Sequence, residues 1–369
     1  MKALHIYRTY YPETQGGLQE AIRQIVTGLE GCGVGSSVFT LAKNATPQRV
    51  FVGGAPVIRA KSILEISSCD FGSPSSVSTF RAEARRADIL NFHYPWPFGD
   101  ILELLGNPGK PYVITYHSDI VRQRLAEALY SPVRKRFFSK AEAIIATSPA
   151  YARTSEYLSR MGKAVNVIPL SIDMESIPAP SVDRELHWRE HFPRPFFLFV
   201  GVLRYYKGLD YLIDAARETG FSVVIAGDGP EGGRLRSIAS GSPNIHFLGR
   251  ISDIDKFTLI RLCRGIVFPS HLRSEAFGVS LLEGAALGKP LISTELGTGT
   301  SYVNAHGETG LVVPPADSAA FSRAMRILMD NPSYAEKLGA GAKIRCAHMF
   351  ATSQIGKQYF GLYEQIVQR

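Results

Sequence analysis

Two carboxylates, Glu275 and Glu283, stand with seven residues between them where a polar loop passes into a short helix. The loop follows an apolar run typical of a buried strand, and Phe277, Gly278 and Val279 are expected to open the helix. The free N–H groups and dipole of a helix start favour an anion such as a diphosphate. Both carboxylates could then bind hydroxyls flanking that anion. Taken alone, the spacing also has an ordinary structural explanation. Glu275 would be a carboxylate of the first helical turn, and Glu283 would lie on the solvated face of the helix.

Two cations, Arg204 and Lys207, stand before a second helix start at Leu209. They follow an apolar run at 196–200 that is expected to be a buried strand. Cations beside a helix N-terminus suit a diphosphate, because they add charge-assisted hydrogen bonds to those of the N–H groups. The alternative is solvated surface charge.

The first third of the chain adds a glycine pair and a histidine. Gly16 and Gly17 lie between an expected strand at 2–7 and a helix at 18–29, which makes a second anion cradle or an ordinary turn. His117 follows an expected strand at 111–116. Open α/β sheets bind ligands at the carboxyl ends of their strands, so His117 is a candidate site residue, with a structural histidine as the alternative. Asp119 is a weaker candidate.

Composition describes an ordinary globular protein. The 369 residues are 45% hydrophobic and 20% charged, enough for two domains with their own cores. No apolar stretch reaches the ~18 residues of a membrane-spanning helix, and the N-terminus lacks the features of a signal peptide. The four cysteines show no C-x-x-C spacing, so neither zinc nor a disulfide framework is indicated. A cytoplasmic protein is expected.

The net charge of +8 is uneven, with 20 Lys/Arg against 14 Asp/Glu up to Asp173. A basic first half suggests nucleic acid, an anionic membrane or a phosphate-bearing substrate as partner. The stretch 122–140 mixes six basic residues and one acid with aromatic residues, so its helix could lie on an anionic membrane or be an ordinary packed helix. No recognisable nucleic-acid-binding module is present, so nucleic acid is not expected.

Strands alternate with helices along both halves, which predicts two α/β domains with parallel sheets. The expected boundaries are 1–172 for the first domain and 190–345 for the second. The segment 346–369 is expected to form a helix that crosses back to the first domain.

Several motifs resemble the retaining glycosyltransferases of family 4. The segment SEAFGVSLLEGAALGKP, residues 274–290, is similar to the family's donor-site signature E-x-F/G-x-x-x-x-x-E-A-x-A-x-G-x-P. The segments YYPETQGG, TYHSDI and GVLRYYKG are similar to its Y-P-P/E-x-x-G-G, T-x-H-D and G-R-L-x-x-x-K-G motifs. The resemblance spans most of the chain and is strongest over 196–315. In the last motif Val202 stands where the family has arginine, and Arg204 lies two residues later.

The resemblance implies a GT-B architecture, two Rossmann-like domains with a nucleotide sugar held mainly by the second. It implies Glu275 on sugar hydroxyls, Glu283 on the ribose, His117 against the donor sugar, and Lys207 with Arg204 on the leaving diphosphate. It also implies donor-binding loops, namely Gly16–Gly17 at the phosphates, Arg250–Ile251 at the base, Phe277–Val279 at a helix start, and Thr298–Gly299 near the phosphates or sugar.

The implied reaction is transfer of a hexose from a nucleoside-diphosphate sugar to a hydroxyl with retention at the anomeric carbon. Neither a cofactor nor a metal is expected. LRYYKGLDYL and ELGTGTSYVN look like bacterial O-antigen and exopolysaccharide transferases of mannose or deoxyhexoses, which favours a GDP-sugar over a UDP-sugar and a lipid-linked glycan acceptor. The alternatives are a non-catalytic nucleotide-sugar-binding partner or regulator, and a sugar-nucleotide epimerase of the same fold.

Overall fold

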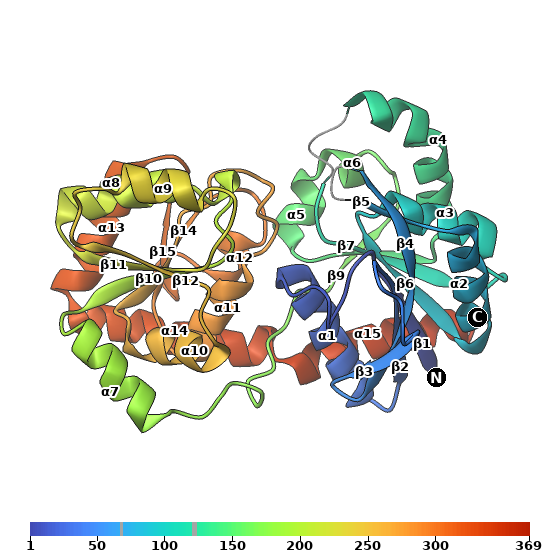
Figure 1. Cartoon of the computed structure of the whole chain (residues 1–369), viewed down its shortest axis with the longest axis horizontal. Helices are drawn as coiled ribbons and strands as arrows, with labels where there is room; N and C mark the ends of the chain where they lie inside the picture. The colour runs from blue at the N-terminus through green and yellow to red at the C-terminus, as the bar shows by residue number, and fades with distance from the viewer. Residues whose placement is uncertain (67–68, 120–123) are drawn as a thin grey trace. The chain divides into compact units, whose positions relative to one another are not determined.

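The chain folds into two compact units, shown as a computed structural model in Figure 1. The structure describes residues 1–66, 69–119 and 124–369. Unit 1 consists of Met1–Ser171 and Thr352–Arg369, and unit 2 of Ile172–Ala351. Each unit is an α/β sandwich around a mainly parallel sheet, so the predicted fold class is confirmed.

The sheet of unit 1 runs in the order β3-β4-β2-β1-β6-β7-β8-β9, and β5 pairs with β4. Its strands are parallel except β3 and β5, which both run antiparallel to β4. The strands are β1 (Lys2–Ile6), β2 (Gly35–Ala42), β3 (Arg49–Val52), β4 (Ala55–Ile66), β5 (Cys69–Gly72), β6 (Ile89–Tyr94), β7 (Tyr112–Tyr116), β8 (Ala143–Ala146) and β9 (Val165–Val167).

The helices of unit 1 cover both faces of this sheet. Apolar side chains of α1 and α15 pack together on one face, where a Cβ at Gly356 would collide with the Gly28 carbonyl. Phe80 of α2 and Phe137 of α4 both contact Phe92 on the opposite face. The helices are α1 (Gly17–Glu30), α2 (Pro74–Arg86), α3 (Pro97–Gly106), α4 (Arg124–Lys140), α5 (Pro149–Thr154), α6 (Glu156–Ser159) and α15 (Thr352–Val367).

The sheet of unit 2 is parallel throughout its described pairs and runs in the order β12-β11-β10-β13-β14-β15. The chain builds outward from β10 to β12 on one side and then continues from β13 on the other. The point where the strand order reverses therefore lies between β10 and β13. The strands are β10 (Phe196–Val200), β11 (Ser222–Ala226), β12 (Ile245–Gly249), β13 (Gly265–Phe268), β14 (Leu291–Thr294) and β15 (Gly310–Val313).

One face of the unit 2 sheet is covered by a large apolar core contributed mainly by α8 and α13. The helix α7, which begins in the gap between the two expected domains, packs on α10 in unit 2, where Asp255 accepts hydrogen bonds from Arg184 and Trp188. The helices are α7 (Val182–His191), the 3₁₀ turn η1 (Tyr205–Lys207), α8 (Leu209–Thr219), α9 (Gly232–Ile238), α10 (Asp253–Leu262), α11 (Val279–Ala286), α12 (Thr300–Val303), α13 (Ser318–Asp330) and α14 (Pro332–Met349).

Two expectations for secondary structure are wrong. In the polar stretch 43–80 the sequence alone predicts one short strand, at 56–59, whereas the structure contains β3, β4, β5 and the start of α2. After the strand at 143–146, Ser148 and Pro149 predict one helix from 148 to about 161, whereas the structure breaks it at Ser155 into α5 and α6. The Ser155 hydroxyl accepts the Leu158 N–H and donates to Asp119 at 2.6 Å, so it caps the second helix instead of continuing the first.

Candidate active site

Lys207 and Glu275 form the central contact of the candidate site in unit 2. Lys207 Nζ lies 2.5 Å from Glu275 Oε2, and the two side chains keep only 11% and 10% of their surface exposed. Ser270 Oγ donates to the same carboxylate oxygen at 3.1 Å. Lys207 follows β10 and Glu275 follows β13, the adjacent strands at which the order reverses. Crevices outside the carboxyl ends of strands at such a switch point bind ligands in open α/β sheets.

The backbone after β10 places the Lys207 ammonium group beside β13. The turn η1 ends at Gly208, whose φ of 65° lies in the left-handed region, and a Cβ there would collide with the Pro269 carbonyl. Lys207 Nζ also lies 4.7 Å from the centre of the Phe268 ring. Arg204 is exposed, and among the described residues its side chain has no hydrogen bond or ion pair.

The loop after β13 turns into α11 at Gly278, as predicted. Gly278 has a φ of 95°, and no side chain caps the helix, so first-turn N–H groups are left for a ligand or water. Phe277 is buried and Val279 is half-buried. Gly299 packs directly on this turn, because its N–H donates to the Ala276 carbonyl at 2.7 Å and a Cβ would collide with Phe277.

Thr298 lies next to this turn in the loop that follows β14. Its side chain is fully buried, and in the part of the chain that the structure describes its hydroxyl has no hydrogen-bond partner. Buried hydroxyls are normally paired, so an unpaired one beside Gly299 marks a position where a bound group could complete the hydrogen bonding.

Glu283 lies on α11 and is already paired. Its Oε1 is 2.8 Å from Lys256 Nζ, and Lys256 also contacts Asp253 at 2.9 Å. Burial opposes the charged form of Lys256, but the carboxylates of Glu283 and Asp253 outweigh it and raise the pKa of this lysine. Lys256 was missed by the sequence analysis because α10 and α11 are brought together only by the fold.

Arg250 and Ile251 follow β12, at the same edge of the sheet. Arg250 is exposed and Ile251 is half-buried. The loop is attached to its neighbour through the Gly227 N–H, which donates to the Gly249 carbonyl at 2.8 Å. Ser252 then caps α10 by accepting the Asp255 N–H. The structure brings this loop to the carboxyl edge, with β11 and β10 between its strand and β13.

In unit 1, Gly16 and Gly17 lie at the start of α1, in the loop that follows β1. Gly16 is the N-cap, and no side chain caps the helix. Strand order in this unit reverses between β1 and β6, so the glycine pair lies at the switch point of its own sheet. The first acid of the helix, Glu20, is held by Arg23 at 2.7 Å.

His117 follows β7 and lies at the end of a row of three buried imidazoles. His5 Nδ1 is 3.1 Å from His93 Nε2, and His93 Nδ1 is 2.9 Å from His117 Nε2. Burial lowers the pKa of His117 to about 3, so its ring is neutral near pH 7. Asp119 accepts hydrogen bonds from the hydroxyls of Tyr116 and Ser155, so its carboxylate has a structural role within unit 1.

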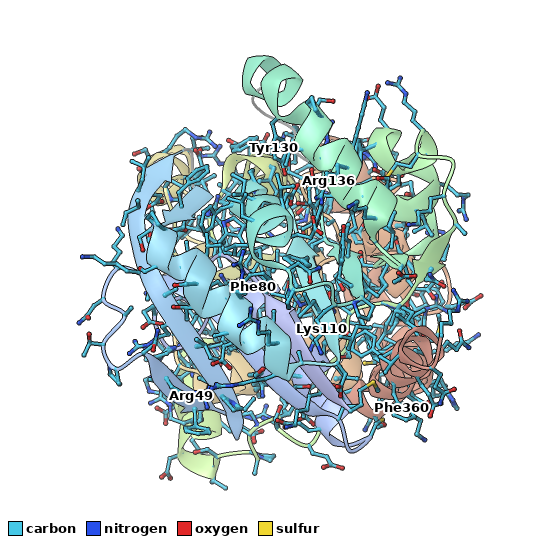
Figure 2. The ribbon with its side chains drawn as sticks, turned by 90° about the vertical axis from the view of Figure 1, so that its right-hand side faces the viewer. Arg49, Phe80, Lys110, Tyr130, Arg136 and Phe360 are labelled. Carbon is cyan, nitrogen blue, oxygen red and sulfur yellow. The ribbon has the colours of Figure 1, made fainter. Side chains whose placement is uncertain are left out.

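The basic stretch 122–140 is described only in part, since residues 120–123 lie outside the described residues. In the remainder, Phe137 and Phe138 are buried in the core of unit 1, and Lys135 and Lys140 are exposed. Figure 2 labels Tyr130 and Arg136 on α4, and both bind acids of α3, Asp100 and Glu103. Within the described ranges, no helix is long and apolar enough to cross a membrane.

Comparison with known proteins identifies the family. The model of group 1 glycosyl transferases matches residues 183–345, and that of glycosyltransferase family 4 matches residues 15–176. A D-rhamnosyltransferase of Pseudomonas aeruginosa is 48% identical over 95% of this chain and 92% of its own length. An O-antigen chain mannosyltransferase of Escherichia coli is 41% identical over 100% of this chain and 99% of its own length.

Among solved structures, a sucrose-phosphate synthase from Thermosynechococcus elongatus superposes with a TM-score of 0.80 at 22% identity, covering 99% of this chain and 98% of its own. At that identity the match establishes the fold, which is of the GT-B type, and the sequence relatives establish the family. The chain therefore belongs to the family 4 and group 1 glycosyltransferases, as its motifs predicted.

Proposed function

We propose that this glycosyltransferase moves mannose or a deoxyhexose from a nucleoside-diphosphate sugar, with GDP as the favoured nucleotide, to a hydroxyl of a growing lipid-linked polysaccharide. Support comes from the two relatives above, whose names give D-rhamnose transfer and O-antigen mannose transfer. We further propose that the anomeric configuration is retained and that the chain needs no metal or other cofactor.

The contact between Lys207 and Glu275 is the observation that carries this function. A buried ammonium at the carboxyl edge can bind a diphosphate, and a carboxylate beside it can bind sugar hydroxyls. With no substrate the two charges neutralise each other. A bound diphosphate would share Lys207, leaving Glu275 to accept from hydroxyl groups and orient the anomeric carbon.

In the proposed transfer, the bond between the anomeric carbon and the diphosphate oxygen breaks, and the diphosphate leaves with the electron pair. The acceptor oxygen bonds to the anomeric carbon on the same face and passes its proton to a diphosphate oxygen. Lys207, Arg204 and the N-terminus of α11 would stabilise the charge on the leaving group. Glu275 is assigned an orienting role and not that of a nucleophile.

The first experiment is a thermal-shift titration with GDP, UDP, ADP and CMP in the presence of EDTA. A nucleotide at 100 times its Kd adds about 2.7 kcal/mol of apparent stability. We expect a shift with GDP that is lost in Lys207→Ala and kept in the control Lys337→Ala, an exposed lysine of α14. A shift with UDP alone would overturn the assigned donor, and no shift with any nucleotide would overturn nucleotide-sugar transfer.

The second experiment is turnover of GDP-mannose and GDP-rhamnose on a lipid-linked glycan, with the product linkage read by NMR. Retention predicts the same anomeric configuration in donor and product. An inverted linkage would overturn the assigned stereochemistry, and activity restored only by a divalent metal would overturn metal independence.

We also propose that the protein acts at the cytoplasmic face of the membrane that carries its acceptor. Because Phe137 and Phe138 are buried, the described part of α4 would contact anionic lipid through Lys135 and Lys140, without inserting those rings. Sedimentation with anionic vesicles should fall in Lys135→Glu/Lys140→Glu. Equal sedimentation with zwitterionic vesicles would contradict an electrostatic contact.

A further inference from the structure

His5, His93 and His117 form a continuous hydrogen-bonded row across three neighbouring strands of unit 1. The strands β1, β6 and β7 are adjacent, and their register places His5 opposite Asn91 and His93 opposite Thr115. The three imidazoles therefore share one face of the sheet near its carboxyl edge. The ring centres are 5.4 and 5.2 Å apart with planes inclined by 23° and 25°. The rings thus meet edge to edge, the geometry in which one nitrogen donates to the lone pair of the next.

The row has a closed end and an open end. Exposure is 0% for His5, 1% for His93 and 5% for His117. At the closed end, His5 Nε2 is buried and has no hydrogen-bond partner among the described residues. At the open end, His117 Nδ1 makes no hydrogen bond with any described residue, although Nε2 of the same ring is engaged by His93.

Burial keeps all three rings neutral, because it lowers the pKa of His5 and His117 to about 3 and that of His93 well below its usual value. A neutral imidazole has one N–H and one lone pair. The row can therefore be hydrogen-bonded in only two ways, with every N–H directed toward His117 or every N–H directed toward His5.

The two directions differ at the closed end. If the N–H groups point toward His5, its Nε2–H is a buried donor without an acceptor. If they point toward His117, His5 Nε2 keeps only an unused lone pair. Orphaned buried N–H groups are rarer in proteins than under-used acceptors, so the second arrangement is favoured. His117 then presents Nδ1–H at the open end.

We propose that His5 and His93 are positioning residues that hold His117 in its Nδ1–H tautomer, so that this ring donates a hydrogen bond to an oxygen of the bound substrate. The role rests on the proposed function, since it concerns how this transferase orients a sugar. Mutual engagement of the ring nitrogens leaves no shared lone pairs for a metal ion, and no group of three potential metal ligands is found in the described ranges.

The direct test is a long-range ¹H–¹⁵N NMR spectrum of the full chain labelled with ¹⁵N-histidine at pH 7. We expect a neutral His117 with its proton on Nδ1. A proton on Nε2 of His117, or a charged His117 ring, would overturn the assignment whatever the activity of the protein. This measurement needs no variant.

The functional test compares His93→Phe with His93→Gln. A glutamine has one donor and one acceptor to join its two neighbours, so it should keep the tautomer of His117 and most of kcat. Phenylalanine fills the space but transmits no hydrogen bond. In His93→Phe we expect His117 to lose its preference for a proton on Nδ1. We expect kcat to fall on the order of 10- to 100-fold, which is somewhat less than the loss on removing a catalytic hydrogen-bond donor.

The exposed His348 of α14 is the matched control, and His348→Gln should keep both kcat and the spectrum of His117. A folded His93→Phe with unchanged kcat would overturn the positioning role. If that variant does not fold, the wild-type spectrum and the kcat of His93→Gln still test the positioning role. A wild-type chain that transfers no sugar while His117 carries Nδ1–H would instead overturn the proposed function.

Discussion

Lys207 and Glu275 lie 68 residues apart in the chain and 2.5 Å apart in the fold, each at the end of one of the two strands where the sheet of unit 2 reverses its order. This pairing joins the cation expected to hold the diphosphate to the carboxylate expected to hold the sugar. Their side chains are mostly buried, so each is the main partner that compensates the charge of the other.

A double-mutant cycle on Lys207→Met and Glu275→Gln should show strong coupling. Each single variant is expected to lower kcat/KM by roughly 10²-fold or more, and the double variant by little more than the worse single one, because the two act as a unit. Lys207→Met should also cost about 3 kcal/mol of unfolding free energy, since it leaves a buried carboxylate unpaired, and Glu275→Gln should recover part of that cost. Steady-state kinetics and urea unfolding measure the two effects. Independent, additive losses would contradict the coupling.

Gly208→Ala should weaken nucleotide binding and Gly220→Ala should not. Both glycines have positive φ, 65° and 70°, so both variants carry a backbone strain of about 1 kcal/mol. Only Gly208 faces the Pro269 carbonyl, and nothing lies within 4 Å of a Cβ at Gly220. Calorimetric titration with GDP should therefore show a higher Kd for Gly208→Ala than for Gly220→Ala. Equal affinity in both would show that the approach of the two loops does not matter for binding.

Thr298→Val and Thr300→Val should have opposite effects on stability. The buried Thr298 hydroxyl has no partner within the described ranges, so valine should be neutral or stabilise the ligand-free protein by up to about 1 kcal/mol. The same change should weaken nucleotide-sugar binding if that hydroxyl completes the site. The Thr300 hydroxyl donates to the Thr294 carbonyl at 3.0 Å, so valine there should destabilise the fold. Thermal unfolding with and without donor measures both. A destabilised Thr298→Val would mean that its hydroxyl has a partner within the protein.

The histidine row predicts that unit 1 loses stability in mild acid. The pKa of His117 is about 3 in the fold, against 6.5 for a free imidazole, so between these values the unfolded state binds more protons. The contribution is complete above pH 6.5 and falls as pH decreases, by about 2 kcal/mol for this ring between pH 6.5 and pH 5. Urea unfolding at pH 7 and pH 5 should show a smaller loss for His117→Gln than for the wild type. Equal losses would mean that folding does not lower the pKa of the His117 ring.

Local sequence pattern determined the alternation of strands and helices, the start of α11 after Phe277 and Gly278, and most candidate side chains, because these depend on periodicity, on glycine and on position at strand ends. It failed where apolar periodicity is weak. The edge strands β3 and β5 are short or partly exposed, and α2 has a mostly polar sequence. Neither the two-residue period of a strand nor the ~3.6-residue period of a helix is therefore clear in these segments.

Only the tertiary structure decided which of those side chains meet. Lys207 touches Glu275 because β10 and β13 are neighbours, Glu283 touches Lys256 because α11 packs near α10, and three histidines align because β1, β6 and β7 are adjacent. Strand order and register depend on long-range packing of whole faces, which no local window of residues contains. For the same reason the contacts of His5 and His93 with His117 became visible only in the fold.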